Sequence, residues 1–324
     1  ITGVNNDVKE ALISEDGTIE ADKALFSLEP MIKMNDSLFN WSNVKSKQSL
    51  GSPENKGDFI FVPTVTWEMG DLQFSSRVTA IGEANKNSKL EIGYTFENHS
   101  DTTKTLDFYL LIRPFQVNPT YQFLNLTGGV GKINSIKEEA DYSISVDEKV
   151  ILPQKKYDAF GAGIFDEGNL ADRIRKDEMP QGKSVIDPAG LANGVIKYHI
   201  SLQPHESGEL YFIVPFYKSE TENLPVTGVA DDFTKSADFW RSKVEHIRFN
   251  LPGSASKIIN TYKSNLVYIL INRDKFGIQP GSRSYERSWI RDGALTSSAL
   301  LKSGITDEVR DFIDWYASHQ YENG

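Results

Sequence analysis

Apolar and polar residues alternate with a period of two over most of residues 18–217. In residues 59–69 the odd positions are Phe, Phe, Pro, Val, Trp and Met, while the even positions become polar toward the end of the segment. Because successive strand side chains point to opposite faces, this pattern predicts a half-buried β-strand. Residues 72–80 and 90–96 repeat it, and Gly70-Asp71 fits a two-residue hairpin turn between the first two strands.

A stretch that is apolar on both sides, residues 106–115, predicts a central strand buried on two faces. The charged segment 166–190, interrupted by Gly and Pro, is expected to be a loop outside the sheets. With more than ten strands and turn-length spacers, the chain is predicted to be mainly β, a large antiparallel β-sandwich (supersandwich). The remaining strands are expected near residues 131–136, 142–146, 158–165, 194–202 and 209–217.

Near residue 231 the hydrophobic period lengthens to that of an amphipathic helix. Apolar residues recur at spacings of four, three, four and three from Phe233 to Ile247. Asp231 and Asp232 suit the helix N-terminus, where carboxylates are favoured. This helix is predicted to link the sandwich to a helical C-terminal part, and Leu251-Pro252-Gly253 ends it.

Three more helices are predicted after the linker. Ser254, Asp292 and Thr306 are suitable N-caps for them, and Gly304 suits the end of the helix that begins at Asp292. We therefore divide the chain into a β-supersandwich (1–228), a linker helix (229–253) and the first helical hairpins of a helical domain (254–324).

Composition narrows the classes of partner. With 35 Lys+Arg against 45 Asp+Glu, the net charge of −10 argues against nucleic acid and anionic membranes. The chain has no cysteine, no apolar run long enough for a membrane span, and five histidines without metal-ligand spacing, so we expect no cofactor and no metal site. The compartment stays open, with a secreted or periplasmic location slightly favoured by Asn-x-Ser/Thr patterns at Asn35, Asn40, Asn98 and Asn125.

Side chains suited to ligand binding are most concentrated in residues 281–293. This segment contains three arginines, two carboxylates, a Tyr and a Trp just before a predicted helix. Aromatic faces, guanidinium groups and carboxylates together suit the C–H patches and adjacent hydroxyls of a sugar. Trp289, Arg291 and Asp292 provide this set. A structural explanation stays open beside it, with Asp292 as an N-cap, Arg287 or Arg291 in surface ion pairs and Trp289 in the core.

The motif Tyr-Glu-Arg-Ser-Trp-Ile-Arg-Asp-Gly-Ala at 285–294, after a β-sandwich and a linker helix, resembles the six-hairpin glycosidases. These are the glucoamylase-like hydrolases, with glycogen-debranching enzymes and disaccharide phosphorylases as relatives. The resemblance implies an α/α barrel in which Trp289, Arg291 and Asp292 hold the terminal sugar. It also makes Tyr285 and Glu286 substrate-binding candidates.

The helical part departs from that family in length. A twelve-helix barrel needs about 190 residues, whereas residues 254–324 number 71. In the family the catalytic carboxylates come from later hairpins, so we expect a truncated piece with no catalytic residue of its own. The parent would be a carbohydrate-active enzyme, an inverting glycoside hydrolase of oligo- or polysaccharides, with phosphorolysis, sugar and linkage left open.

Two consequences accompany this interpretation. The chain alone is expected to be inactive, and its unfinished helices are expected to expose apolar stripes that drive self-association. The alternative is a non-catalytic module, a β-sandwich that binds glycan or packs on a partner, with a helical docking tail. Glycan binding by the sandwich alone would favour the alternative.

Overall fold

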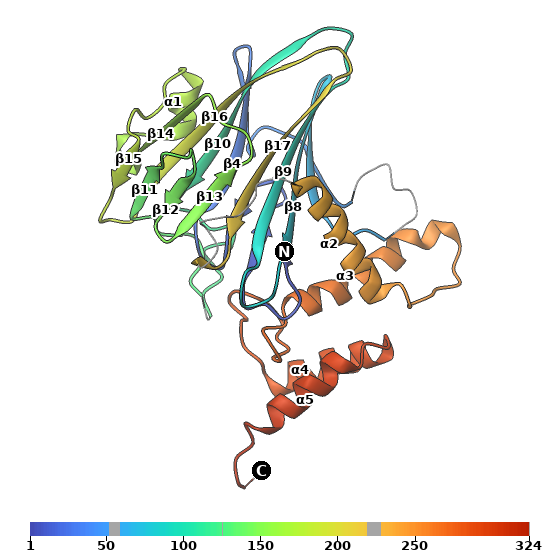
Figure 1. Ribbon diagram of the computed structural model, residues 1–324. Helices are drawn as coiled ribbons and strands as arrows, with labels where there is room; N and C mark the ends of the chain where they lie inside the picture. The colour runs from blue at the N-terminus through green and yellow to red at the C-terminus, as the bar shows by residue number, and fades with distance from the viewer. Residues whose placement is uncertain (52–58, 125, 219–227, 324) are drawn as a thin grey trace.

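The computed structural model describes residues 1–51, 59–124, 126–218 and 228–323. Two large antiparallel sheets face each other; of the four helices that follow, the first lies against the outer face of one sheet and the other three gather at one end of the sandwich (Figure 1). The predicted fold class, a mainly β sandwich with C-terminal helices, is confirmed. The proposed domain boundaries remain a prediction.

The first sheet has eight strands, and its central strand is β10. Residues 108–112 of β10 are buried on both faces, which confirms the predicted central strand. The strand order is β1 (Thr2–Gly3), β2 (Glu10–Ile13), β3 (Ile19–Glu20), β4 (Ser27–Met34), β10 (Lys104–Arg113), β16 (Ala192–Leu202) and β14 (Ala159–Ile164), with β5 (Ser37–Phe39) beside β4.

The second sheet has nine strands. The hairpin between β7 and β8 turns through Gly70 and Asp71, with Gly70 at φ +66°, so the predicted two-residue turn is present. The strand order is β15 (Ser184–Ile186), β11 (Ser135–Glu138), β12 (Ile144–Val146), β13 (Lys149–Pro153), β17 (Ser207–Pro215), β9 (Lys89–Asn98), β8 (Leu72–Ile81), β7 (Pro63–Met69) and β6 (Ser46–Leu50).

The main core lies between the sheets and is rich in aromatic rings. Phe74 of β8 lies 5.3 Å from Phe96 of β9 and 5.9 Å from Phe108 of β10, ring centroid to centroid. The inward positions are those that the period-two pattern predicted. Aromatic pairs at this spacing add to the burial of apolar area that stabilises the sandwich.

One segment predicted to be a loop instead contains regular secondary structure. The segment expected to be a loop excursion at 166–190 contains the short helix α1 (Leu170–Arg175) and strand β15. Leu170 and Ile174, one turn apart, are buried against Tyr109 and Val195 on the outer face of the eight-stranded sheet. A helix of six residues is too short to show a hydrophobic period, and its burial against the sheet is what stabilises it.

Four helices come after the sandwich: α2 (Val229–Val244), α3 (Ser256–Ile271), α4 (Ile290–Lys302) and α5 (Asp307–Ala317). Among the described residues, no helix is both long and apolar enough to cross a bilayer. Two Phe residues before β7 join the helical core, where Phe61 packs 6.0 Å from Trp240 and 5.2 Å from Tyr268. The strand predicted over residues 59–69 therefore begins only at Pro63.

The helix starts differ from those predicted. α4 begins two residues before Asp292, with Trp289 at the N-cap position, so the prediction of Asp292 as an N-cap is wrong. Ser254 lies within a 3₁₀ turn before α3, and Thr306 occupies the N-cap position of α5 without a side-chain hydrogen bond. Gly304, at φ +76°, does follow α4 in the left-handed conformation that glycine tolerates.

Candidate functional site

The loop between α3 and α4 is anchored in the β-sandwich by Arg283. Its side chain is almost wholly buried, and Nε donates to Glu20 Oε1 at 2.9 Å while Nη1 donates to Glu10 Oε1 at 3.1 Å. Glu20 Oε2 also accepts the backbone N–H groups of Val117 and Asn118. One buried arginine therefore joins the loop to β2, to β3 and to the segment after β10.

Lys23 forms the second anchor. Its Nζ lies 2.5 Å from Glu286 Oε1, 3.2 Å from Asp274 Oδ2 and 3.3 Å from Glu10 Oε1. Burial acts against the charge of Lys23, but the carboxylates of Glu10, Asp274 and Glu286 raise its pKa overall. Glu286, one of the predicted sugar-binding residues, is therefore held in place by a cation from the sandwich.

Burial also changes the acidity of the carboxyl groups in this cluster. It raises the pKa of Glu10 to about 8, although Lys23 and Arg283 favour the charged form. It raises the pKa of Asp274 as well, with the Lys23 ammonium acting in the opposite direction. Because the cluster lies between the sandwich and the loop, its charge balance affects how firmly the loop is held.

Past these anchors the loop carries exposed aromatic side chains. The Tyr285 ring is half exposed and lies 6.0 Å from the ring of Trp289, tilted by 63°. The Arg287 guanidinium lies 5.9 Å from the Trp289 ring centroid. Trp289 is only partly buried, so it is not the core residue that the structural explanation required.

Arg291 and Asp292 occupy the first turn of α4. The Arg291 side chain is 83% exposed, and its Nη2 lies 3.6 Å from Asp292 Oδ2, a carboxyl that is 28% exposed. A carboxylate in the first turn interacts favourably with the helix dipole. The pair thus presents a planar donor group and an acceptor group to solvent.

The five predicted residues therefore lie on one continuous segment, residues 285–292, with a fixed base and an exposed upper side. Aromatic faces, a guanidinium and carboxylates in this arrangement suit recognition of a polyhydroxylated ligand. Cleavage of a glycosidic bond needs an acid and a base on opposite sides of the bond, and this single segment does not provide such a pair. Among the described residues, no group of three or more His, Asp and Glu is placed to hold a metal.

Sequence reasoning did not find the residues that position this segment. Lys23, Glu10 and Glu20 lie more than 250 positions before the loop, within or next to short strands. In the sequence, nothing distinguishes Arg283 from the other two arginines of the loop. The only indication of an ion pair was a charged residue within a region of β-strands, since a charge that is buried there needs a partner.

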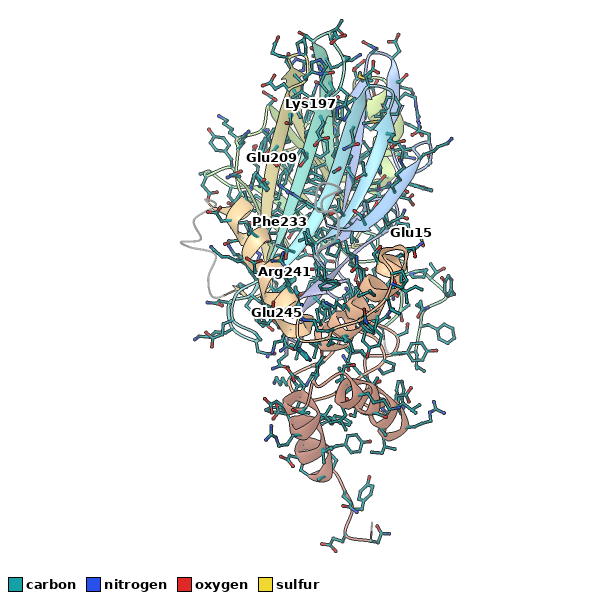
Figure 2. All side chains as sticks on the ribbon, turned by 90° about the vertical axis from the view of Figure 1, so that its right-hand side faces the viewer. Glu15, Lys197, Glu209, Phe233, Arg241 and Glu245 are labelled. Atoms are coloured by element: carbon teal, nitrogen blue, oxygen red, sulfur yellow. The ribbon has the colours of Figure 1, made fainter. Side chains whose placement is uncertain are left out.

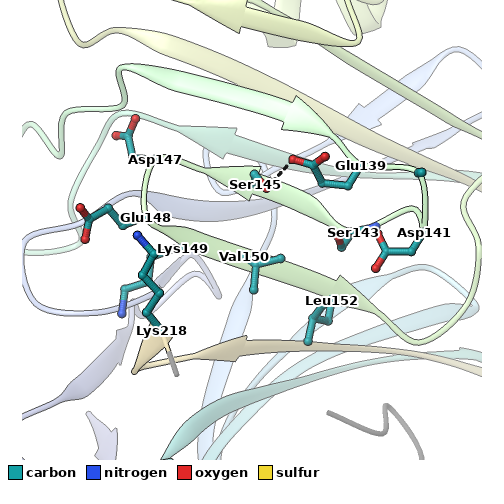
Figure 3. A pocket seen from close by; sticks show the side chains of 11 residues that line it. Glu139, Asp141, Ser143, Ser145, Asp147, Glu148, Lys149, Val150, Leu152 and Lys218 are labelled. Atoms are coloured by element: carbon teal, nitrogen blue, oxygen red, sulfur yellow. Dashed lines mark hydrogen bonds between the residues drawn. The ribbon is translucent and has the colours of Figure 1, made fainter. Parts of the chain in front are cut away.

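A separate recess on one face of the hairpin formed by β12 and β13 is lined by several acidic residues (Figure 3). Its carboxylates are used locally: Glu139 accepts from Ser145 at 2.9 Å, and Asp141 accepts from Ser143 at 2.7 Å. Asp147 likewise accepts from the backbone N–H groups at 134 and 135. These contacts shape turns, and they explain the recess without a ligand.

The fold defines the class of the protein, a mainly β two-sheet sandwich followed by packed helices. No family model matches the chain, and no curated protein matches it. Among solved structures, a putative kojibiose phosphorylase from human microbiome aligns with 9% sequence identity and a TM-score of 0.35, over 85% of this chain and 35% of that one. The chain thus spans about a third of that protein, and a likeness at this level carries no argument about function.

Proposed function

We propose that residues 285–292 form part of the sugar-binding subsite of a carbohydrate-active enzyme that acts on glycosidic bonds of oligo- or polysaccharides. The observation that carries the proposal is the anchored segment itself: Arg283 is buried, whereas Tyr285 and Arg291 are exposed and Trp289 and Asp292 are partly exposed. A base held by buried ion pairs reduces the entropy lost when a ligand binds.

The charge of the segment favours a neutral ligand. Arg291 lies beside Asp292, and Glu286 lies on Lys23, so both carboxylates of the segment have a cation beside them, while the Arg287 guanidinium lies against the Trp289 ring. Paired charges attract free ions weakly, but they still donate and accept hydrogen bonds. A neutral sugar uses both capacities, through its hydroxyls and its C–H faces.

The helices suggest how the subsite would be completed. Leu295 of α4 is 68% exposed, Ile313 of α5 is 56% exposed and Ile258 of α3 is 69% exposed. Each of these three successive helices therefore leaves an apolar side chain exposed that further helices would cover. In this proposal those helices also supply the acid and base of an inverting reaction, and the described residues supply recognition only. A second copy of this chain is the alternative partner that would cover these side chains.

The test is sugar binding by the full chain, measured by affinity electrophoresis through neutral polysaccharides and by calorimetry with neutral oligosaccharides. Trp289→Ala and Arg291→Ala are expected to weaken binding by tenfold or more. Trp41→Ala and Arg310→Ala are matched controls, since Trp41 is 54% exposed and Arg310 pairs with Asp307 on the surface of α5. Equal binding by all four variants would refute a role for the segment.

The second candidate function is a non-catalytic glycan-binding module. A groove on the outer face of the nine-stranded sheet, lined mostly by polar residues, favours it. In that case binding survives Trp289→Ala and Arg291→Ala, and the sandwich alone determines affinity.

A further inference from the structure

A groove of about 540 Å³ lies where helix α2 crosses the outer face of the nine-stranded sheet. Figure 2 looks onto this face, with Glu209 on β17 above the helix and with Phe233 and Arg241 along it. The sheet forms its floor, α2 forms one wall, and Ile60 and Val62 line another side. This volume lies within the range of small-molecule sites.

Strand pairing arranges the outward side chains of the floor in three parallel rows. Alternate residues of a strand share a face, so the rows lie about 7 Å apart. No side chain in these rows is apolar except for the ring of a tyrosine. The rows are Thr64–Arg77–Gly93–Tyr211, Thr66–Ser75–Thr95–Glu209 and Glu68–Gln73–Glu97–Ser207.

Gly93 allows Arg77 to lie flat across the sheet. A Cβ at position 93 would be 2.8 Å from Arg77 Nε and 3.1 Å from Tyr211 Cε1, closer than such atoms pack. With hydrogen in that place, Arg77 Nη2 reaches across β9 to Tyr211 Oη at 2.7 Å and to Glu209 Oε1 at 2.9 Å. Its guanidinium also lies 4.8 Å from the Phe233 ring centroid.

The neighbouring rows are held in the same way. Gln73 Nε2 donates to Glu97 Oε2 at 2.9 Å, and the hydroxyls of Thr66 and Ser75 are 3.0 Å apart. These side chains are only partly buried, and each keeps capacity for a further hydrogen bond. The floor is therefore an ordered array of donors and acceptors that needs little rearrangement to bind a ligand.

The charges in the groove disfavour an anionic ligand. Arg77 pairs with Glu209, and Arg241 pairs with Asp238 at 2.9 Å. The third carboxylate, Glu97, accepts from the neutral Gln73, so among the described lining residues both cations are paired and none is left over to attract an anion. An uncharged ligand that donates and accepts hydrogen bonds along its length matches this array. A neutral saccharide has that chemistry, and rows spanning about 14 Å favour a short oligosaccharide over a single sugar.

We infer that this groove is a binding site for a neutral oligosaccharide, centred on Arg77, Thr95 and Glu209. It deepens the second candidate function and does not depend on the loop before α4. The groove and that loop use different residues from different elements, so the failure of one leaves the other testable.

The experiment measures binding of the full chain to a panel of neutral gluco-, xylo- and manno-oligosaccharides by calorimetry and by affinity electrophoresis in the matching polysaccharides. Thr95→Arg places a long side chain over the middle row. Its control is Thr105→Arg, the same change at an exposed position of the other sheet. A second variant, Gln73→Ala with Ser75→Ala, removes hydrogen-bonding groups without adding bulk.

The wild-type chain is expected to bind at least one ligand of the panel. Thr95→Arg and the double alanine variant should weaken binding at least tenfold, whereas the control Thr105→Arg should bind like the wild type. Absence of wild-type binding to the whole panel overturns the inference. So does equal affinity in a folded Thr95→Arg or double alanine variant, with folding checked by near-UV circular dichroism.

Discussion

Arg283 and Glu20 lie 263 positions apart in the chain and form a buried ion pair, with Nε 2.9 Å from Oε1. The pair connects the loop before α4 to strand β3. Its position explains why the exposed side of that loop has a defined geometry, since the loop cannot move without separating two desolvated charges.

Arg283→Met should lower the free energy of unfolding by about 3 kcal/mol or more, because it leaves the buried Glu20 carboxylate with backbone donors alone. Urea denaturation measures the change. Arg287→Met is the matched control, being the same substitution at an exposed position four residues later, and should change stability by less than about 0.5 kcal/mol. A loss below about 1 kcal/mol in Arg283→Met would contradict the anchoring role.

Gly293→Ala should destabilise the packing of α4 on α5. A Cβ there would lie 2.3 Å from Cζ of Phe312, a ring that is buried in the helical core. Overpacking of this kind costs about 1–3 kcal/mol. Gly253→Ala, where the added Cβ meets nothing within 4 Å, is the matched glycine control. Hydrogen exchange of the α4 and α5 amides should rise in the first variant and not in the second.

Stability should fall as the pH rises from 5 to about 7, in part because of Glu91. Burial raises the pKa of Glu91 to about 7, although Lys89 lies 2.7 Å away and favours the charged form. Between its unfolded and folded pKa values the folded chain holds a proton that the unfolded chain lacks, so raising the pH costs stability until about pH 7 and no further. The contribution of Glu91 is at most about 3 kcal/mol.

Burial fixes the direction of this effect, and the neighbours of Glu91 modify its size. The Asp232 carboxylate of α2 raises the pKa of Glu91 further, while Lys89 and Lys235 are the nearby cations. Glu10, with its pKa raised to about 8, acts in the same direction. Glu91→Gln should therefore flatten part of the slope of unfolding free energy against pH. An unchanged slope in this variant would show that Glu91 is ionised throughout the range.

Leu295→Gln with Ile313→Gln should leave stability within about 0.5 kcal/mol per site, because both side chains are largely exposed. The double variant should bind less of a hydrophobic dye and should associate less at high concentration, measured by sedimentation. Leu300→Gln is the contrast, since that leucine is fully buried and its replacement should destabilise strongly. Unchanged dye binding in the double variant would mean that Leu295 and Ile313 do not form the apolar surface to which the dye binds.

Much of the fold was predictable because strand and helix burial leave a local signal. Phe74 and Phe96 alternate with polar neighbours on their strands, and Phe233 and Trp240 repeat at helical spacing, so each pattern identifies an element and its inner face. The short helix α1 and the start of α4 were not predicted correctly, because six residues show no period and a cap residue does not fix a helix start to within two positions.

The sequence by itself determined the β-sandwich, the onset of helices near residue 229 and the polar–aromatic composition of residues 285–292. Only the tertiary structure decided what supports that segment, through Arg283 on Glu20 and Lys23 on Glu286. It also decided the groove, which requires the register of three strands to place Arg77, Gly93 and Tyr211 in one row. Pairing between residues far apart depends on how strands and helices dock, and no periodic pattern along the chain encodes it.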